Sequence, residues 1–402
     1  RRRVAGGQRW LVFLESATEV NATGLSALLA NYDARKAAYL GNLLRDETSS
    51  IVHHYNTDTV YPQALAGFAL SGSLARRLVG ELKKKPLGGS QQIEPVWELA
   101  KWIQDTCGVI LEDRSDAFCT EQKQGCVTWV SRSLRRSGKL RLREDVIIGV
   151  KTVAKFHASR VPLIHEFWGT KSPAQVLYLS NEAFDGIDGA EVVNLSPEFG
   201  DLVDPAKEAT EQGSGHCSKM EAILKYFFRH QPGKAWYVVT DDDTLLNVPM
   251  LLDVLDSHDS SKPICLGERY GWAHREEISG TNYITTGGGM VLSGPALAKL
   301  VQCSGCTCRR ANAPDDMTLG TWLQTLGVPI VHEEGFHQSE PHNYHPELLA
   351  NLEPPVSFHR FAVRLPRESS EEQLAKARRE NWHDWVQRHF ARPKGVQPEN
   401  EF

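Results

Sequence analysis

The chain has 402 residues, of which 41% are hydrophobic and 24% charged. These proportions exclude a disordered, collagen-like or coiled-coil chain, and the length predicts two or three domains. The 45 basic residues are outnumbered by 50 acidic ones, and this net charge of −5 argues against nucleic acid as a partner. Because no uninterrupted apolar run approaches the ~18 residues of a membrane-spanning helix, we also expect no membrane span.

An internal repeat organises the sequence. Residues 10–21 align without a gap with residues 236–247, and the two stretches share a Trp, a Val, a Thr and the final Asn. Three more matched pairs follow in the same order, namely 39–41 with 265–267, 67–72 with 289–294, and 99–104 with 319–324. Four matched blocks in one order indicate two copies of one domain.

The two copies differ at polar positions. Where the second copy has Asp241-Asp242-Asp243, Gly287-Gly288 and Asp315-Asp316, the first has Glu15-Ser16-Ala17, Leu65-Ala66 and Pro95-Val96. We therefore predict a degenerate, non-catalytic domain over 1–140 and a catalytic domain over 141–402. About 90 residues at the front of the second copy, from Asp145, have no counterpart in the first.

Eight clustered cysteines and two glycosylation sequons favour the secretory pathway. The cysteines allow four disulfides, although the spacing of Cys303, Cys306 and Cys308 would also suit part of a zinc site. The sequons begin at Asn21 and Asn194.

The segment between the copies, residues 134–143, is polar and basic and predicts a linker, or alternatively a patch for an anionic partner. Apolar runs at 145–150, 176–179 and 236–239 then alternate with helical stretches near 154–164 and 216–229. This alternation predicts an α/β domain with a largely parallel sheet, which binds ligands at the carboxyl ends of its strands. Residues 368–390 are helical in character and predict a bracing tail.

Three adjacent carboxylates, Asp241 to Asp243, directly follow the third of these apolar runs. Because like charges repel at this separation, a bound Mg²⁺ or Mn²⁺ would explain them. The alternative is an acidic turn in which Asp243 caps a helix.

Further polar residues predict a site around this triplet. Gly287 and Gly288 would let the backbone approach a ligand, or form a flexible turn. Asp315 and Asp316 stand at the start of a predicted helix. One of the two carboxylates could cap the helix while the other serves as a general base. His337 is a metal-ligand candidate, and Lys219 and Arg160 are cations that could meet a diphosphate, although each of these three would otherwise be an ordinary surface residue.

Residues 145–337 resemble the fringe-like β1,3-glycosyltransferases. Five ordered motifs carry the resemblance: Val150-Lys151-Thr152 with His157 and Arg160 downstream, the Asp triplet, Thr286-Gly287-Gly288 before a Val-Leu-Ser strand, Pro314-Asp315-Asp316, and a late Phe-His pair. The resemblance implies an α/β fold of the GT-A, Rossmann-like type, a UDP-sugar donor and inversion at the anomeric carbon.

The resemblance also implies residue roles. Asp243 would bind Mn²⁺ or Mg²⁺ with His337 as second protein ligand, and Asp316 would be the catalytic base. The residues implied to line the UDP-sugar pocket are Thr152, Arg160, Ser180, Asn181, Lys219, Asp241, Asp242, Gly287 and Gly288. Fringes usually carry an acidic residue near the position of Asn181, so this chain departs from them there.

The degenerate front copy, the run Thr240-Asp-Asp-Asp-Thr-Leu245 and the tail are similar to one branch of the family. That branch adds glucose from UDP-glucose to O-linked fucose on thrombospondin type 1 repeats. The likeness implies such O-fucosylated repeat proteins as partners and the endoplasmic reticulum lumen as location, with the Golgi as second choice. The alternatives are transfer of N-acetylglucosamine or galactose, or a non-catalytic glycan-binding lumenal protein.

Overall fold

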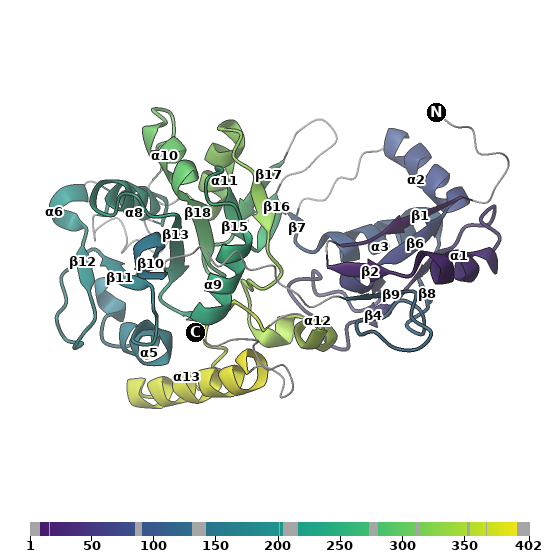
Figure 1. Cartoon of the computed structure of the whole chain (residues 1–402). Helices are drawn as coiled ribbons and strands as arrows, with labels where there is room; N and C mark the ends of the chain where they lie inside the picture. Colours follow the sequence, from purple (N-terminus) through teal and green to yellow (C-terminus); the bar gives the residue numbers. More distant parts are fainter. Residues whose placement is uncertain are drawn as a thin grey trace. The chain divides into compact units, whose positions relative to one another are not determined.

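A computed structural model describes residues 9–15, 17–84, 91–130, 142–200, 202–203, 216–272, 280–310, 313–351, 354–366 and 368–391 (Figure 1). The chain forms two compact units. Unit 1 contains Arg1–Ser133, Gly271–Gly280 and His342–Asn351, and unit 2 contains Leu134–Tyr270, Thr281–Pro341 and Leu352–Phe402. The basic linker predicted over 134–143 lies outside the residues whose side chains are described.

A seven-stranded mixed sheet forms the centre of unit 2, in the order β12-β11-β10-β13-β18-β15-β19. Its strands are β10 (Val146–Lys151), β11 (Gln175–Ser180), β12 (Val192–Asn194), β13 (Trp236–Asp241), β15 (Cys265–Gly267), β18 (Met290–Ser293) and β19 (Ile330–His332). The four strands from β12 to β13 are parallel, and β18 runs antiparallel between β13 and β15. The predicted strands and the α/β class are confirmed, since continuous apolar runs form buried parallel strands.

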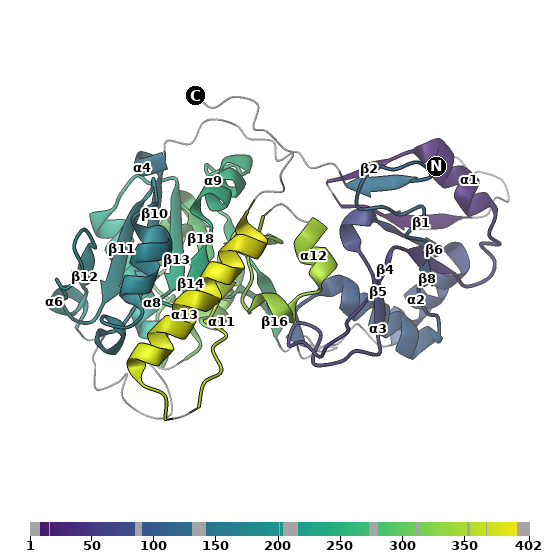
Figure 2. The same cartoon turned by 90° about the horizontal axis from the view of Figure 1, so that it is seen from below.

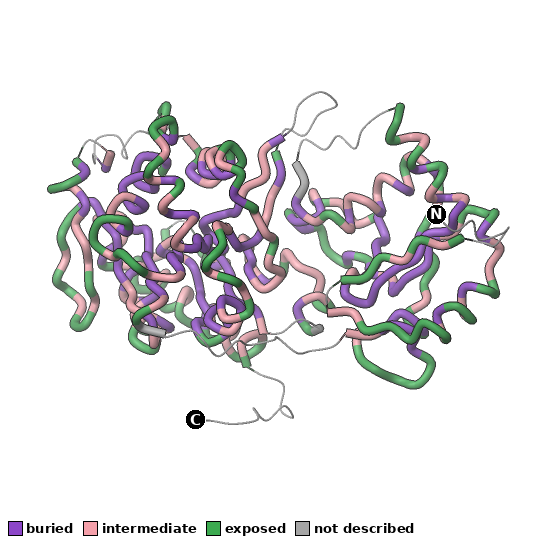
Figure 3. Tube along the Cα trace, turned by 45° about the horizontal axis from the view of Figure 1, so that its top comes forward, coloured by how far each residue is buried: buried purple, intermediate pink, exposed green. Residues whose placement is uncertain are grey.

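Helices cover both faces of this sheet. Figure 1 shows α8 (His216–His230), α10 (Gly294–Gln302) and α11 (Asp315–Thr325) on one side and α5 (Val161–Ile164) and α13 (Glu371–Trp385) on the other. The first three pack apolar side chains such as Phe227, Leu297 and Leu323 against the strands, so the sheet is buried (Figure 3). Gly149 permits this packing, because a Cβ there would lie 2.6 Å from the ring of Phe227.

Shorter elements complete unit 2. They are α4 (Leu142–Asp145), η2 (Ala154–Phe156), η3 (His165–Gly169), α6 (Ser196–Phe199), β14 (Thr244–Leu246), α9 (Val248–Ser257), β16 (Arg269–Trp272), β17 (Thr281–Ile284), η4 (Pro341–Asn343), β20 (Ser357–His359) and η5 (Val386–Phe390), of which β16 and η4 extend into the segments of unit 1. The helix expected near 154–164 is thus divided into η2 and α5. The expected tail helix is present as α13 and η5.

The tail packs against the segment that follows β20. Its helix α13 is the yellow helix in Figure 2. The indole of Trp382 is fully buried, donates to the carbonyl of Arg360 over 3.1 Å and stacks on Phe361. Trp385 meets Phe358 edge-on at a centroid distance of 5.8 Å. A helix rich in charge is therefore held to unit 2 by its two tryptophans.

Unit 1 repeats half of the unit 2 sheet. Its strands β1 (Trp10–Phe13), β6 (Phe68–Ser71), β3 (Tyr39–Gly41) and β8 (Glu112–Asp113) have the order and directions of β13, β18, β15 and β19. The register also agrees, since Trp10 pairs with Ser71 as Trp236 pairs with Ser293. Two related copies are therefore confirmed, and in the described part of unit 1 nothing corresponds to β10, β11 or β12.

Helices and short strands surround this smaller sheet. They are β2 (Thr18–Val20), α1 (Ala22–Ala30), β4 (Leu43–Arg45), β5 (Val60–Pro62), η1 (Ala64–Ala66), α2 (Gly72–Lys84), β7 (Gln91–Gln92), α3 (Pro95–Cys107), β9 (Thr128–Val130) and α12 (Pro346–Asn351). The core of unit 1 includes Leu70, Trp97 and Ile103, and is separate from the core of unit 2.

Three disulfides join Cys119 to Cys126, Cys217 to Cys308, and Cys303 to Cys306. The two remaining cysteines, Cys107 and Cys265, are buried as free thiols. All members of the Cys303-to-Cys308 cluster are oxidised, so the alternative of a zinc site there is wrong. Within the described ranges, no helix combines the length and apolar character that crossing a membrane requires.

The Cys217–Cys308 disulfide closes a sequence separation of 91 residues, against 3 for Cys303–Cys306. Because a cross-link restricts the unfolded chain more when its loop is longer, replacing the first pair by serines should lower the free energy of unfolding by about 4–5 kcal/mol and the second pair by about 2 kcal/mol. Urea unfolding of the two double variants checks this. Equal losses would show that lost contacts in the folded state dominate.

Candidate active site

The acid triplet lies at the carboxyl end of β13, next to the ends of the parallel strands β10 and β11. Asp241 is the last residue of β13, and Asp242 and Asp243 form the turn to β14. Thr244 fixes this turn, because its hydroxyl accepts from the Asp241 amide and donates to the carbonyl of Gly287. The triplet is therefore at the ligand-binding edge expected for such a sheet.

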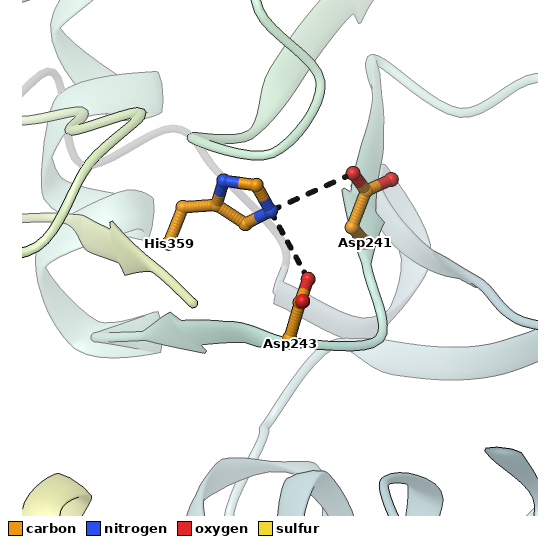
Figure 4. A group of neighbouring side chains, drawn as sticks. All are labelled: Asp241, Asp243 and His359. Atoms are coloured by element: carbon orange, nitrogen blue, oxygen red, sulfur yellow. Dashed lines mark hydrogen bonds and ion pairs between the residues drawn. The ribbon is translucent and has the colours of Figure 1, made fainter. Parts of the chain in front are cut away.

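A histidine from a distant strand completes a group with two of these carboxylates. β14 pairs antiparallel with β20, and this register places His359 opposite Thr244. The Nε2 atom of His359 lies 3.0 Å from Asp243 Oδ1 and 3.8 Å from Asp241 Oδ2, as Figure 4 shows. Burial lowers the pKa of His359, but hydrogen bonding and attraction to Asp243 outweigh it, so the pKa is raised overall.

The spacing of this group fits a divalent cation. The three ligand atoms lie within 4.8 Å of one another, and an octahedral ion with bonds of about 2.1 Å has ligands about 3 Å apart in adjacent positions and about 4 Å apart in opposite ones. Among the described residues, the only group of His, Cys, Asp or Glu side chains with metal-ligand spacing consists of Asp241, Asp243 and His359. The Nδ1 atom of His359 lies 3.0 Å from the carbonyl oxygen of Gln338, which would orient Nε2 toward a metal.

His337, expected as the histidine of this site, lies elsewhere. Its Nδ1 is 3.1 Å from the carbonyl oxygen of Ser357, and its ring stacks on Phe358. Burial lowers its pKa to about 3. The sequence contains two Phe-His pairs, Phe336-His337 and Phe358-His359, and the β14–β20 pairing brings only the second histidine to Asp243.

The two predicted glycines support this histidine. A Cβ on Gly287 would lie 2.4 Å from the imidazole of His359, so a side chain there would push the ring away from Asp243. The amide of Gly288 donates to the side-chain oxygen of Gln338 over 2.7 Å. Gly287 thus leaves room for the ring of His359, and Gly288 leaves room for the backbone of His337 and Gln338. Both are close approaches to protein, whereas the sequence predicted a close approach to a ligand.

Asp242 is held by two predicted pocket residues. Thr152 donates to Asp242 Oδ2 over 2.8 Å, and Arg160 donates to Asp242 Oδ1 and to Asp243 Oδ2 over 2.7 and 3.0 Å. Burial raises the pKa of Asp242 to about 6. For Asp243, the bonds from His359 and the charge of Arg160 overcome burial and lower the pKa to about 2. Packing on the ring of Phe156 fixes the guanidinium in this position.

A buried lysine of the Val150-Lys151-Thr152 motif, to which the sequence alone assigned no role, links two parts of the site. Lys151 ends β10 with 7% of its surface exposed, and its Nζ lies 3.0 Å from Asp241 Oδ1 and 2.6 Å from Asp315 Oδ2. Burial disfavours ionisation of Asp315, but the lysine charge reverses this effect and lowers its pKa. A lysine directly after the apolar run 146–150 is the sequence signal that could have identified it.

Asp316, the predicted base, begins α11 together with Asp315. One of its oxygens accepts from the amide of Met317 over 2.7 Å. Burial and the adjacent charge of Asp315 raise the pKa of Asp316 to about 7. A carboxyl group with this pKa exchanges a proton readily near neutral pH, as a general base must.

The remaining predicted residues lie at the ends of β11 and on α8. The hydroxyl of Ser180 is 2.6 Å from His157 Nε2, and Asn181 accepts from the amide of Ala154. Lys219 on α8 is buried, and its charge, after burial itself, contributes to lowering the pKa of His157. The structure thus brings these residues to the same edge of the sheet as the acid triplet.

Comparison with known proteins gives the family. Residues 142–375 match the model of the fringe-like family. A mouse β-1,3-glucosyltransferase is 37% identical over 87% of this chain and 69% of its own length, and a human one is 35% identical over 87% and 68%. The bovine β-1,3-N-acetylglucosaminyltransferase lunatic fringe is 30% identical over 48% of this chain and 52% of its own. The chain therefore belongs to the fringe-like family of glycosyltransferases.

Proposed function

We propose that the chain is an inverting, metal-dependent β1,3-glucosyltransferase. It moves glucose from UDP-glucose to the 3-hydroxyl of O-linked fucose on thrombospondin type 1 repeats. One observation carries this proposal. Asp241, Asp243 and His359 form a group that could bind a metal, here called the metal group. Lys151 contacts both Asp241 of this group and Asp315, the neighbour of Asp316 on α11. The glucosyltransferases that share 35–37% of its residues over 87% of the chain support the choice of glucose.

Asp241, Asp243 and His359 would hold the ion, Mn²⁺ or Mg²⁺. When bound, such an ion supplies positive charge next to the diphosphate of the donor. We assign Arg160 and Lys219 as the cations that face the UDP part of the donor. The same part of the pocket is lined by Thr152, Ser180 and Asn181. Asp242, fixed by Thr152 and Arg160, faces the donor sugar or ribose in this assignment.

Asp316 takes the proton in the transfer step. The acceptor oxygen attacks the anomeric carbon of glucose and forms the new glycosidic bond, the bond from that carbon to the diphosphate breaks, and UDP leaves with the electron pair. The proton of the acceptor hydroxyl moves to the Asp316 carboxylate. One displacement of this kind inverts the anomeric centre.

Lys151 keeps the two halves of this machinery together. Its contacts to Asp241 and Asp315 fix the start of α11 relative to the end of β13. The ionised Asp315 that it stabilises also raises the pKa of Asp316. The charge of Lys151 itself acts in the opposite direction on this pKa. We infer that Lys151 sets the position of Asp316.

For unit 1 we propose a non-catalytic role in acceptor recognition or scaffold support. It carries Pro95 and Val96 at the start of α3, where unit 2 carries Asp315 and Asp316 at the start of α11. For location we propose the endoplasmic reticulum lumen, with the Golgi as second choice. The three disulfides support an oxidising compartment of the secretory pathway.

A donor screen tests the proposed function. Incubating the protein with Mn²⁺, a fucosylated thrombospondin repeat and UDP-glucose should add one hexose, read by intact mass. The lunatic fringe relatives favour UDP-N-acetylglucosamine as the alternative donor, and UDP-galactose completes the set. Transfer from either of these instead of UDP-glucose would replace the glucose assignment, and no transfer from any donor would support a glycan-binding protein.

Replacing Asp316 by Asn should lower kcat by ~10²–10⁴-fold, because the variant cannot accept the proton. Binding of UDP and Mn²⁺, measured by calorimetry, should stay within a factor of about two, since Asp316 is outside the metal group. Asp259→Asn, at an exposed acid paired with Lys262, is the matched control and should change neither quantity. Loss of UDP binding in Asp316→Asn would instead assign Asp316 a structural role.

The pH dependence of kcat/KM should follow the ionisation of Asp316. Its pKa is raised to about 7, so the ionised base is scarce below that pH and complete above it. We expect kcat/KM to increase about tenfold per pH unit at acid pH and to level off above about pH 7. A profile that is already flat at pH 5 would contradict this assignment.

Replacing His359 by Ala should lower the affinity for Mn²⁺ by at least about tenfold, since losing even a hydrogen-bond partner of a metal ligand costs that much. Titration calorimetry of Mn²⁺ in the presence of UDP measures it. His337→Ala is the matched control, because it removes a buried imidazole outside the metal group. Should His337→Ala weaken Mn²⁺ binding and His359→Ala leave it unchanged, the ligand set proposed above is wrong.

A further inference from the structure

Two tyrosines lie on adjacent strands beside the proposed base. Tyr270 is on β16 and Tyr283 on β17, which are neighbours in one small sheet, and their ring centroids are 6.1 Å apart at 56°. Both side chains are half-buried. Neither phenolic hydroxyl has a hydrogen-bond partner among the residues that the structure describes. Such hydroxyls can donate to and accept from a ligand.

Close packing of α11 on β17 brings this pair to Asp316. A Cβ on Gly320 would lie 2.6 Å from the Cβ of Tyr283 and 2.4 Å from the carbonyl oxygen of Asn282, so the helix lies directly against the strand at this glycine. Asp316 precedes Gly320 by four residues and thus shares its helix face. In agreement, the Asp316 charge adds to burial in raising the pKa of Tyr283 to about 12.

The degenerate copy provides an internal comparison. Because Gly67 to Ser71 and Gly289 to Ser293 share one register, Tyr61 on β5 is the counterpart of Tyr283. Leu44, which pairs with Tyr61, likewise corresponds to Tyr270. Tyr61 is only 1% exposed and donates to Asp46 Oδ1 over 2.8 Å.

The ring of His53 covers Tyr61 edge-on at 4.7 Å. In the copy whose helix begins with Pro95-Val96, the equivalent tyrosine, Tyr61, is therefore buried and its hydroxyl is hydrogen-bonded. In the copy whose helix begins with two acids, Tyr283 is half-buried and its hydroxyl has no hydrogen-bond partner among the described residues. This difference between equivalent positions points to a ligand that the second copy alone receives.

We propose that Tyr270 and Tyr283 form the acceptor-sugar subsite, in which the aromatic faces pack on the apolar face of a pyranose and the hydroxyls bond to its hydroxyl groups. The inference rests on the proposed transferase function. A pyranose combines C–H faces with a ring of hydroxyls, which matches two half-buried phenols. A 6-deoxy sugar such as fucose presents more apolar surface than a hexose, and its attacking hydroxyl would then be directed at Asp316.

Removing single groups tests the subsite. In Tyr283→Phe the loss of one hydrogen bond should raise the KM for the acceptor about 3- to 10-fold, while the KM for UDP-glucose changes less than about twofold. The melting temperature should not change, because the hydroxyl bonds to no described residue. Tyr270→Leu, which installs the residue of the first copy, should raise the acceptor KM by at least as much.

Tyr61→Phe is the matched control, because it removes the equivalent hydroxyl from the degenerate copy. It should lower the melting temperature through the lost bond to Asp46 and leave the acceptor KM unchanged. Each variant is assayed with a fucosylated thrombospondin repeat and with p-nitrophenyl α-fucoside. Equal effects on both acceptors support contact with the sugar.

An unchanged acceptor KM in Tyr283→Phe and Tyr270→Leu, with an active wild-type protein, would overturn the subsite. An effect on the protein acceptor alone would overturn it too, because the tyrosines would then contact the polypeptide. A wild-type protein that transfers hexose to neither acceptor would overturn the proposed function itself. The two failures are thus distinguished by the wild-type measurement.

Discussion

The buried ammonium of Lys151 is the interaction on which the site depends. It stands between Asp241 at the end of β13 and Asp315 at the start of α11. Lys151 and Asp315 are buried, whereas the side chain of Asp241 is 22% exposed. A buried pair that loses one partner leaves an uncompensated charge, so each member holds the others in place. A separation fixed in this way suits a reaction in which a leaving group and an attacking hydroxyl must be placed together.

The group of Asp241, Asp243 and His359 is held in place by a part of the chain that is distant from the acid triplet in sequence. β20 delivers His359 by pairing with β14, Gly287 leaves room for the ring, and Trp382 of α13 fixes the backbone that follows. Arg360 there adopts a φ of 75°, a conformation that side chains other than glycine rarely adopt. Such conformations persist where surrounding contacts impose them, and functional sites are where they concentrate.

The two copies share one scaffold but differ in their polar residues. Both keep the register of four strands, because the apolar alternation that fixes it is preserved. They differ in whether equivalent polar side chains have hydrogen-bond partners among the described residues. In unit 1, Tyr61, Asp46 and His53 bond to or pack on one another. In unit 2, the hydroxyl of Tyr283 lacks such a partner among the described residues, while Asp316 keeps a raised pKa.

The sequence by itself determined the repeat, the strand runs, the acid triplet and Asp316, because each is a local pattern: apolar spacing, adjacent carboxylates, or acids at a helix start. Only the tertiary structure decided which Phe-His pair supplies the metal-group histidine, since that follows from the pairing of β14 with β20. The same holds for Lys151, whose importance lies in meeting Asp315, 164 residues away. Long-range contacts of this kind depend on strand order and helix packing, which no local pattern encodes.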